Sequence, residues 1–395
     1  MWQAAGLVAL VAAGAYAAVR ANQPGNASAG RSRGTVASPT ESPSPPAWPH
    51  GSGACGWTAY KPLMSPQPLT ERTGARVLVG GYGVRLVDAD AGTARPVTGI
   101  PSDQQHVTSE LVSAAGAVYA LSARCDGTGS RVYRVENGTA HPVAGGSGGF
   151  LLAGPTRAWT VTYPDDPTGR VVLGLLGTGR SLTLPPEADP RADTSAGLVV
   201  AVRHRNPISG RPPDVVVLDP ATGRPVRGLG AGRTLAAHGT QILMLLGRCD
   251  EGDAVPTCTV ARVDLRTAQV LDRYPLPNGR APVDAGTVSR DGRLVAFQLG
   301  RGHPDPRFDQ GDPLPPSDVA VLHLDNGRLD IVPGLELAPK TSAGLVFTAD
   351  GGWLFATVSD GDHAHVLGWH PGLGAPRAVA RLSGPVAWAP PVVIA

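Results

Sequence analysis

A β-hairpin motif repeats along most of this chain. Its clearest copy, Asp214–Gly228, reads DVVVLDPATGRPVRG: a β-branched apolar run, a turn, and the start of a return strand. β-Branched residues suit a pleated sheet, whereas Asp, Pro and Gly favour a tight turn. Related hairpins are expected at 84–97, 132–143, 171–184, 260–271, 319–332 and 366–379.

The turns of these seven hairpins recur with a regular period. Their centres lie near positions 92, 138, 178, 223, 268, 327 and 373, so successive turns are 40 to 59 residues apart. A second pair of strands precedes most hairpins, most clearly at 196–204, 235–247, 286–299 and 344–358. Four short strands per period are typical of propellers. The pattern predicts an all-β, seven-bladed β-propeller with strands A, B, C and D in each blade.

The two ends of the repeat region complement each other. Only one strand, 76–80, precedes the first hairpin, and the chain finishes with the strand-like segments 386–390 and 392–395. Pairing of this C-terminal strand with the N-terminal blade would complete a blade and remove open sheet edges. We therefore expect the N- and C-terminal strands to close a ring over residues 72–395.

Two of the expected A–B turns carry a family motif. Ser289–Phe297 reads SRDGRLVAF and Thr348–Ala356 reads TADGGWLFA. Both resemble the S-P-D-G-x-x-(I/L)-A-F repeat of TolB-like and WD-repeat-like β-propellers, although both lack the proline. The resemblance implies an exported or membrane-tethered bacterial protein with this architecture. It does not specify an activity, because one fold hosts many functions.

Residues 1–20 are interpreted as a signal peptide or a signal-anchor helix. The segment 2–19 is apolar and has no charged side chain, and as a helix it would be about 27 Å long. Ala15–Ala17 fits a small-x-small cleavage site, which favours a signal peptide. An uncleaved anchor is the alternative. We expect a membrane tether through residues 2–19.

The segment 21–71 is interpreted as a linker and N-terminal extension, because it is rich in Pro, Ser and Gly and cannot bury a core. The positive-inside rule would place the arginines that follow the helix in the cytoplasm; these are Arg20, Arg31 and Arg33. The cysteines favour export instead. We therefore expect a location at the cell membrane on its extracytoplasmic side, or secretion.

Four cysteines allow three disulfide pairings: Cys55, Cys125, Cys249 and Cys258. Cys249 and Cys258 bracket one short loop, which suits a local disulfide, and Cys55 would then pair with Cys125. Four free buried thiols are the alternative. The sequence has no C-x-x-C motif to suggest a zinc site, and an even number of loop cysteines favours an oxidising compartment.

Net charge and motifs limit the function. The chain has a net charge of +2 and no basic run interleaved with aromatic residues, so we expect no nucleic-acid partner. Gly145–Gly149 matches G-x-S-x-G but precedes a strand, so it is interpreted as a turn. We expect no cofactor, no metal and no catalytic residue, and we expect a monomer.

The long connections are expected on one face of the ring. B–C and D–A connections share a face, and here they are long, whereas A–B and C–D turns are short. The long ones span 98–110, 185–195, 203–214, 248–259, 300–318 and 333–342. Binding residues usually lie on such loops. The candidate ligand-binding residues are Arg203, His204, His303, Phe308, Asp309, Asp362 and His363.

Two functions compete. The first is a non-catalytic extracytoplasmic binding or scaffold module, whose partner is a protein or a cell-envelope ligand at the B–C/D–A face. The alternative is a propeller enzyme of the lyase, lactonase or glycosidase type with its site at the mouth of the central channel. Convergence of acidic and histidine side chains on the axis would favour the enzyme; those to test are His204, His303, Asp309, Asp362 and His363.

Overall fold

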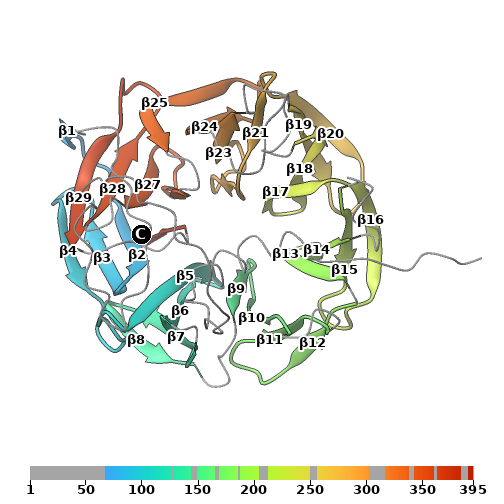
Figure 1. Cartoon of the computed structure of the whole chain (residues 1–395), viewed down its shortest axis with the longest axis horizontal. Helices are drawn as coiled ribbons and strands as arrows, with labels where there is room; N and C mark the ends of the chain where they lie inside the picture. Colours follow the sequence, from blue (N-terminus) through green and yellow to red (C-terminus); the bar gives the residue numbers. More distant parts are fainter. Residues whose placement is uncertain are drawn as a thin grey trace, which may run out of the picture.

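Seven β-sheet blades surround a central axis in the computed structural model (Figure 1). The described residues are 67–125, 128–143, 149–164, 169–185, 187–203, 212–249, 256–301, 316–337, 342–359, 363–383 and 390–394. Each blade has its A strand nearest the axis and its D strand at the rim (Figure 1). The predicted all-β, seven-bladed propeller is confirmed.

Blades 2, 3 and 4 follow one another along the chain as antiparallel sheets. Blade 2 contains β5 (His106–Ala114), β6 (Ala117–Arg124), β7 (Arg131–Glu136) and β8 (Thr139–Pro142). Blade 3 contains β9 (Phe150–Ala153), β10 (Ala158–Thr162), β11 (Val172–Leu175) and β12 (Ser181–Thr183). Blade 4 contains β13 (Ala188–Thr194), β14 (Gly197–Val202), β15 (Asp214–Leu218) and β16 (Pro225–Ala231).

Blades 5, 6 and 7 continue the same order. Blade 5 contains β17 (Arg233–His238), β18 (Gln241–Arg248), β19 (Thr257–Asp264) and β20 (Val270–Pro275). Blade 6 contains β22 (Thr287–Val288), β23 (Leu294–Arg301), β24 (Ser317–His323) and β25 (Leu329–Leu337). Blade 7 contains β26 (Gly344–Phe347), β27 (Leu354–Ser359), β28 (His363–Trp369) and β29 (Arg377–Ser383).

Blade 1 closes the ring with strands from both ends of the chain. The C-terminal strand β30 (Val392–Ile394) pairs antiparallel with β2 (Arg76–Gly81), and β3 (Gly83–Asp88) and β4 (Thr93–Pro96) complete the blade. The predicted closure of the ring is therefore confirmed.

Two short strands were not predicted. β1 (Gln67–Pro68) pairs in parallel with β29 and extends blade 7 to five strands, and the Arg377 guanidinium donates to Gln67 Oε1 at 2.7 Å. β21 (Arg280–Pro282) pairs with β19 and with β23, so blades 5 and 6 form one continuous sheet. Each of these strands therefore pairs a blade with a segment that is not one of its own four strands.

One predicted connection is wrong. The segment 185–195 was expected to be a D–A loop, but it contains β13, the innermost strand of blade 4. Its sequence, ADPRADT, has none of the β-branched apolar residues that identify a strand, and its register shifts between Pro190 and Ala192. The segment 98–110 likewise contains the first residues of β5.

The family motif builds the A–B turn in both of its copies. The Ser289 hydroxyl donates to Asp291 Oδ1 at 2.7 Å and accepts from the Leu294 N–H at 2.9 Å. Thr348 and Asp350 repeat the side-chain bond at 2.5 Å. A hydroxyl residue and an aspartate two positions later therefore close the turn without the family's proline.

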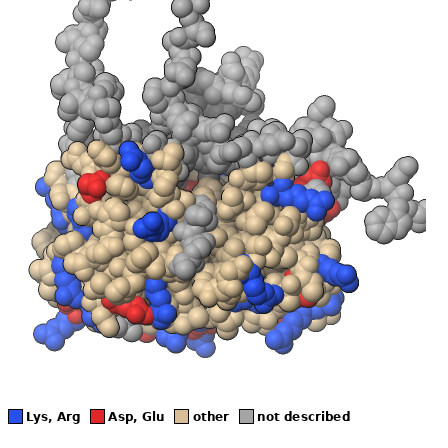
Figure 2. Space-filling view, turned by 90° about the horizontal axis from the view of Figure 1, so that it is seen from below, with Lys and Arg blue, Asp and Glu red and all other residues tan. Residues whose placement is uncertain are grey.

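The hydrophobic core lies between neighbouring blades. Phe297 in blade 6 is fully buried with residues of blade 5 such as Leu243 and Val260. Phe355 in blade 7 packs with Val77 in blade 1, across the closure of the ring. The described core thus consists of seven separate apolar clusters, one at each junction between neighbouring blades. Seen from the side, arginine and acidic side chains are spread over the visible face of the described residues (Figure 2).

The predicted Cys249–Cys258 disulfide is present, with the two Cα atoms 4.8 Å apart. Cys125 is disulfide-bonded as well, and its predicted partner Cys55 lies outside the described residues. The disulfide is consistent with an extracytoplasmic location. Among the described residues, no helix is long and apolar enough to cross a bilayer; the segment 2–19 is not one of them.

Candidate functional site

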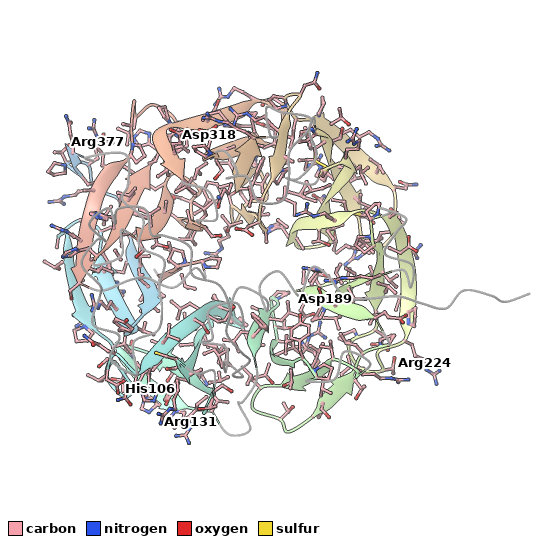
Figure 3. All side chains as sticks on the ribbon, in the orientation of Figure 1. His106, Arg131, Asp189, Arg224, Asp318 and Arg377 are labelled. Carbon is pink, nitrogen blue, oxygen red and sulfur yellow. A yellow bond between two sulfur atoms is a disulfide. The ribbon has the colours of Figure 1, made fainter. Side chains whose placement is uncertain are left out.

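Asp189, on the innermost strand β13, is the centre of a buried polar cluster that blades 3 and 4 build together (Figure 3). The Tyr163 hydroxyl donates to Asp189 Oδ1 at 2.6 Å, and Arg191 Nη2 lies 2.6 Å from Asp189 Oδ2. Arg203 Nη2 approaches the same oxygen at 3.6 Å. We call Tyr163, Asp189, Arg191 and Arg203 the Asp189 cluster.

The topology places this cluster at the B–C/D–A face. Asp189 lies at the start of an A strand, which follows a D–A connection. Tyr163 and Arg203 each follow the last residue of a B strand, where a B–C connection begins. The cluster therefore lies at the inner part of the face where the long connections emerge.

Arg203 is the least satisfied member of the cluster. Its side chain is only 10% exposed, and both Nη1 and Nη2 are buried without a hydrogen-bond partner among the described residues. The 3.6 Å contact with Asp189 is too long for a hydrogen bond. Burial lowers the pKa of Arg203, and the charge of Asp189 opposes that shift. A buried guanidinium without hydrogen bonds is costly, so it marks a place where a ligand can supply them.

Tyr163 is held as a hydrogen-bond donor. Burial, followed by the negative charge of Asp189, raises the pKa of the phenol far above its ordinary value. The phenol stays protonated at physiological pH and donates to the carboxylate. The ring of Phe150 packs edge-on against Tyr163, with 5.6 Å between the ring centroids. The aromatic pair fixes the side of the cluster that blade 3 contributes.

Glu110 is a second unusual group on an innermost strand. It lies on β5 in blade 2, and burial raises the pKa of its carboxyl to about 8. Its side chain makes no hydrogen bond or ion pair with the described part of the chain. Nearby on the same sheet, the hydroxyls of Thr108 and Ser122 are buried and form no hydrogen bond with the described residues. An acidic side chain with a shifted pKa on an innermost strand is a candidate functional residue.

The chemistry available to the Asp189 cluster is recognition of an acceptor group. Two guanidiniums, those of Arg191 and Arg203, surround a single carboxylate, so the cluster keeps an excess of positive charge. Arginine presents its donors in a planar fork that matches carboxylates and other oxyanions. No group of three or more His, Cys, Asp or Glu side chains with metal-binding geometry occurs within the described ranges.

Of the residues predicted from sequence, only Arg203 lies in this cluster. His363 lies on β28, a C strand of blade 7, and its Nδ1 is 3.1 Å from Arg381 Nη2 on β29. The remaining candidates lie outside the described residues: His204, His303, Phe308, Asp309 and Asp362.

Four residues of interest were not predicted from the sequence: Tyr163, Asp189, Arg191 and Glu110. Three of them lie in segments interpreted as connections, and Tyr163 follows a strand that matched the repeat only weakly. Their contacts join residues far apart in the chain, as in the Tyr163–Asp189 bond between positions 26 residues apart. The only sequence feature that pointed to Asp189 and Arg191 was the mixture of acidic and basic residues at 187–193.

A second buried aspartate lies on the same strand. Asp193 accepts from Arg157 Nε at 2.9 Å and from Arg157 Nη2 at 2.7 Å, and the Trp159 indole N–H donates to it at 2.9 Å. Its side chain is completely buried. This group ties blade 3 to blade 4 near the A–B turn, at the opposite end of β13.

Neither a protein-family model nor a curated protein matches this sequence. Among solved structures, a prolyl endopeptidase aligns with a TM-score of 0.50 at 12% identity, over 80% of this chain and 49% of its own. A putative 6-phosphogluconolactonase from Bacteroides fragilis gives 0.45 at 14% identity, over 83% and 100%. TolB from Acinetobacter baumannii gives 0.41 at 14% identity, over 81% of each chain. At such identities the likeness concerns the β-propeller fold alone.

Proposed function

We propose that this chain is an extracytoplasmic binding module that holds a protein or cell-envelope ligand at its B–C/D–A face, over the Asp189 cluster. The observation that carries the proposal is Arg203, whose buried terminal nitrogens at that face form no hydrogen bond with any residue that the structure describes. A carboxylate or carbonyl oxygen of the ligand would accept from them. In this proposal residues 2–19 tether the module to the membrane.

The framework around this face supports binding because it is already rigid. The ends of the longest B–C connection are held by Asp318, which pairs with Arg280 at 2.6 Å and with Arg301 at 3.2 Å. The Cys249–Cys258 disulfide closes the base of another B–C connection, and Arg233 Nη1 donates to the Cys249 carbonyl at 2.9 Å. A preorganised framework loses less entropy when a ligand binds.

The proposal is tested with the tagged full chain as bait in extracts of the cell envelope. We expect a bound ligand that is lost in Arg203→Met and weakened when residues 302–315 are replaced by a short Gly-Ser turn. The matched control changes Thr222 and Arg224 in the C–D turn of blade 4, on the opposite face, and should retain the ligand. Retention by R203M together with loss in the control would overturn the choice of face.

An enzymatic role is the second candidate, and Glu110 is the observation that favours it. A carboxyl with a pKa of about 8 is poised to exchange a proton near neutral pH, as a general acid or base must be. Turnover of lactone or p-nitrophenyl glycoside substrates that disappears in Glu110→Gln would support this candidate. Turnover that E110Q retains would exclude a role for Glu110.

A further inference from the structure

A groove lies between blades 5 and 6 on the A–B/C–D face, opposite the Asp189 cluster. Its volume is about 700 Å³, and its walls are Arg262 and residues 272–275 of blade 5 with residues 292–293 and 324–327 of blade 6. We propose that this groove and the adjoining strand β20 bind an extended acidic peptide segment of a partner protein.

The floor of the groove is rigid. Tyr274 is 7% exposed, and its hydroxyl donates to the Leu324 carbonyl at 2.6 Å, which joins the two blades. The Leu324 N–H in turn donates to the Arg293 carbonyl at 2.7 Å, so the two turns of blade 6 are fixed to each other. Gly327 lies against the Tyr274 ring, where an added Cβ would be 3.3 Å from Cδ1. A preformed floor of this kind favours affinity.

The walls carry arginines that are only partly neutralised. Arg262 pairs with Asp272, yet its Nε is buried with no acceptor in the described structure. Arg293 is 75% exposed, and its Nε lies 3.8 Å from Asp291. Arg273 is exposed and forms no ion pair with any described residue.

Acidic side chains within the groove do not balance these cations. The lining contains three arginines, Arg262, Arg273 and Arg293, but two aspartates, Asp272 and Asp325. Asp291 lies at the margin, 3.8 Å from Arg293, and offsets one of these charges, so the cation without an ion pair among the described residues is Arg273. Planar guanidiniums arranged around a groove of this size match carboxylates of a ligand with several acidic groups.

The adjoining strand favours a peptide over a small anion. β20 is the outer strand of blade 5 and pairs with β19, and no other described strand covers its outer edge. It also exposes two large apolar side chains, Val270 at 43% and Leu271 at 41%. An unpaired edge with apolar side chains next to a basic groove suits an added strand that alternates apolar and acidic residues.

The chain itself shows that the outer edge of a blade accepts a strand. β1 adds to β29 at the rim of blade 7, through the register Gln67↔Arg377 and the Leu69 N–H bond to the Ala378 carbonyl at 2.9 Å. An arginine of the outer strand, Arg377, also binds the side chain of the added segment. Blade 5 offers the same kind of edge, with Arg273 on its outer strand.

The test uses the full chain in mild detergent and a fluorescein-labelled peptide of alternating Glu and Val, followed by fluorescence anisotropy. We expect saturable binding, and a Kd that rises by about tenfold or more in the double variant Arg273→Glu, Arg293→Glu. The matched control is Arg224→Glu, Arg227→Glu, two exposed arginines at blade 4 (Arg224 at the rim in Figure 3). It removes the same charge and should stay within about twofold of wild type.

Two further experiments distinguish pairing with the strand edge from attraction between charges alone. A peptide of equal charge in which proline replaces the valines cannot pair with a strand edge, so it should bind roughly tenfold more weakly. Inorganic phosphate at the same concentration should not displace the Glu-Val peptide. The proposal is overturned if the wild type does not bind, if both double variants weaken binding equally, if proline has no effect, or if phosphate competes. Because this groove lies away from Arg203, none of these results bears on the proposed ligand at the opposite face.

Discussion

Two aspartates on one strand, Asp189 and Asp193, show how similar buried ion pairs can differ in purpose. Both lie on β13, four positions apart. Each forms an ion pair with an arginine and accepts a hydrogen bond from an aromatic side chain that blade 3 contributes. Asp193 faces the end of the blade with short turns, and Asp189 faces the end with long connections.

The difference lies in how completely the arginines are satisfied. Arg157 donates two hydrogen bonds to Asp193 and a third, at 3.4 Å, to the Thr194 carbonyl. Arg203 has both terminal nitrogens buried and unbonded within the described chain. A fully bonded pair stabilises the junction between blades, whereas an incompletely bonded cation is destabilising until a ligand completes it. We therefore expect that removal of Arg157 lowers the stability of the protein strongly, whereas removal of Arg203 changes it little.

The largest effect is expected for Arg157→Met. The variant leaves the carboxylate of Asp193 completely buried without its counter-ion, which costs about 3–5 kcal/mol of unfolding free energy. Urea unfolding followed by tryptophan fluorescence measures the change. A loss below about 1 kcal/mol would show that Asp193 is not a structural anchor.

A smaller loss is expected for Trp159→Phe. Phenylalanine keeps most of the buried ring but removes the indole N–H that donates to Asp193 at 2.9 Å. A hydrogen bond to a charged group contributes roughly 1.5–3 kcal/mol, so unfolding should shift by about that amount. Thermal unfolding by circular dichroism provides the measurement, and an unchanged midpoint would contradict the assignment.

The smallest loss is expected for Arg203→Met. Asp189 keeps its hydrogen bond from Tyr163 and its ion pair with Arg191, and the variant removes a buried cation whose terminal nitrogens form no hydrogen bond with the described residues. The unfolding free energy should change by less than about 1 kcal/mol, or increase. If R203M destabilises the protein as much as R157M does, both clusters are structural and the comparison fails.

The pH dependence of stability provides a finer test on another innermost strand. The carboxyl of Glu110 has a pKa raised from 4.5 to about 8 in the folded protein. The unfolded chain therefore loses this proton first, and wild type loses stability as the pH rises from 4.5 to 8. Glu110→Gln should match wild type at pH 4 and have the higher Tm at pH 8. Parallel Tm curves for the two proteins would contradict the raised pKa.

The sequence predicted those parts of the fold that have a local signature. The hairpin 214–228 combines β-branched residues with an Asp219-centred turn, in which the carboxylate accepts from the Ala221 N–H at 2.9 Å and from the Thr222 hydroxyl at 2.8 Å. Strand β13 has no such signature, because it carries Asp, Pro and Arg instead of β-branched apolar residues. β-Propensity identifies strands that are covered on both faces more readily than it identifies strands at the inner edge of a blade.

The candidate site was predictable only in part for the same reason. Arg203 could be selected because it follows a strand B whose apolar run is unmistakable. Its neighbours Tyr163 and Asp189 belong to different blades, and the packing of blade 3 against blade 4 brings them together. Contacts between blades depend on the register and twist of each sheet, which the spacing of hairpins does not reveal.

Site-specific photo-crosslinking in intact cells tests the central claim most directly. A photoreactive amino acid is placed at Thr162, which is exposed next to Tyr163, or at Arg224 in the opposite turn of blade 4. We predict a ligand adduct from position 162 that disappears when Arg203→Met is added, and no adduct from position 224. An adduct from 224 alone, or one from 162 that R203M leaves unchanged, would contradict a ligand site at the Asp189 cluster.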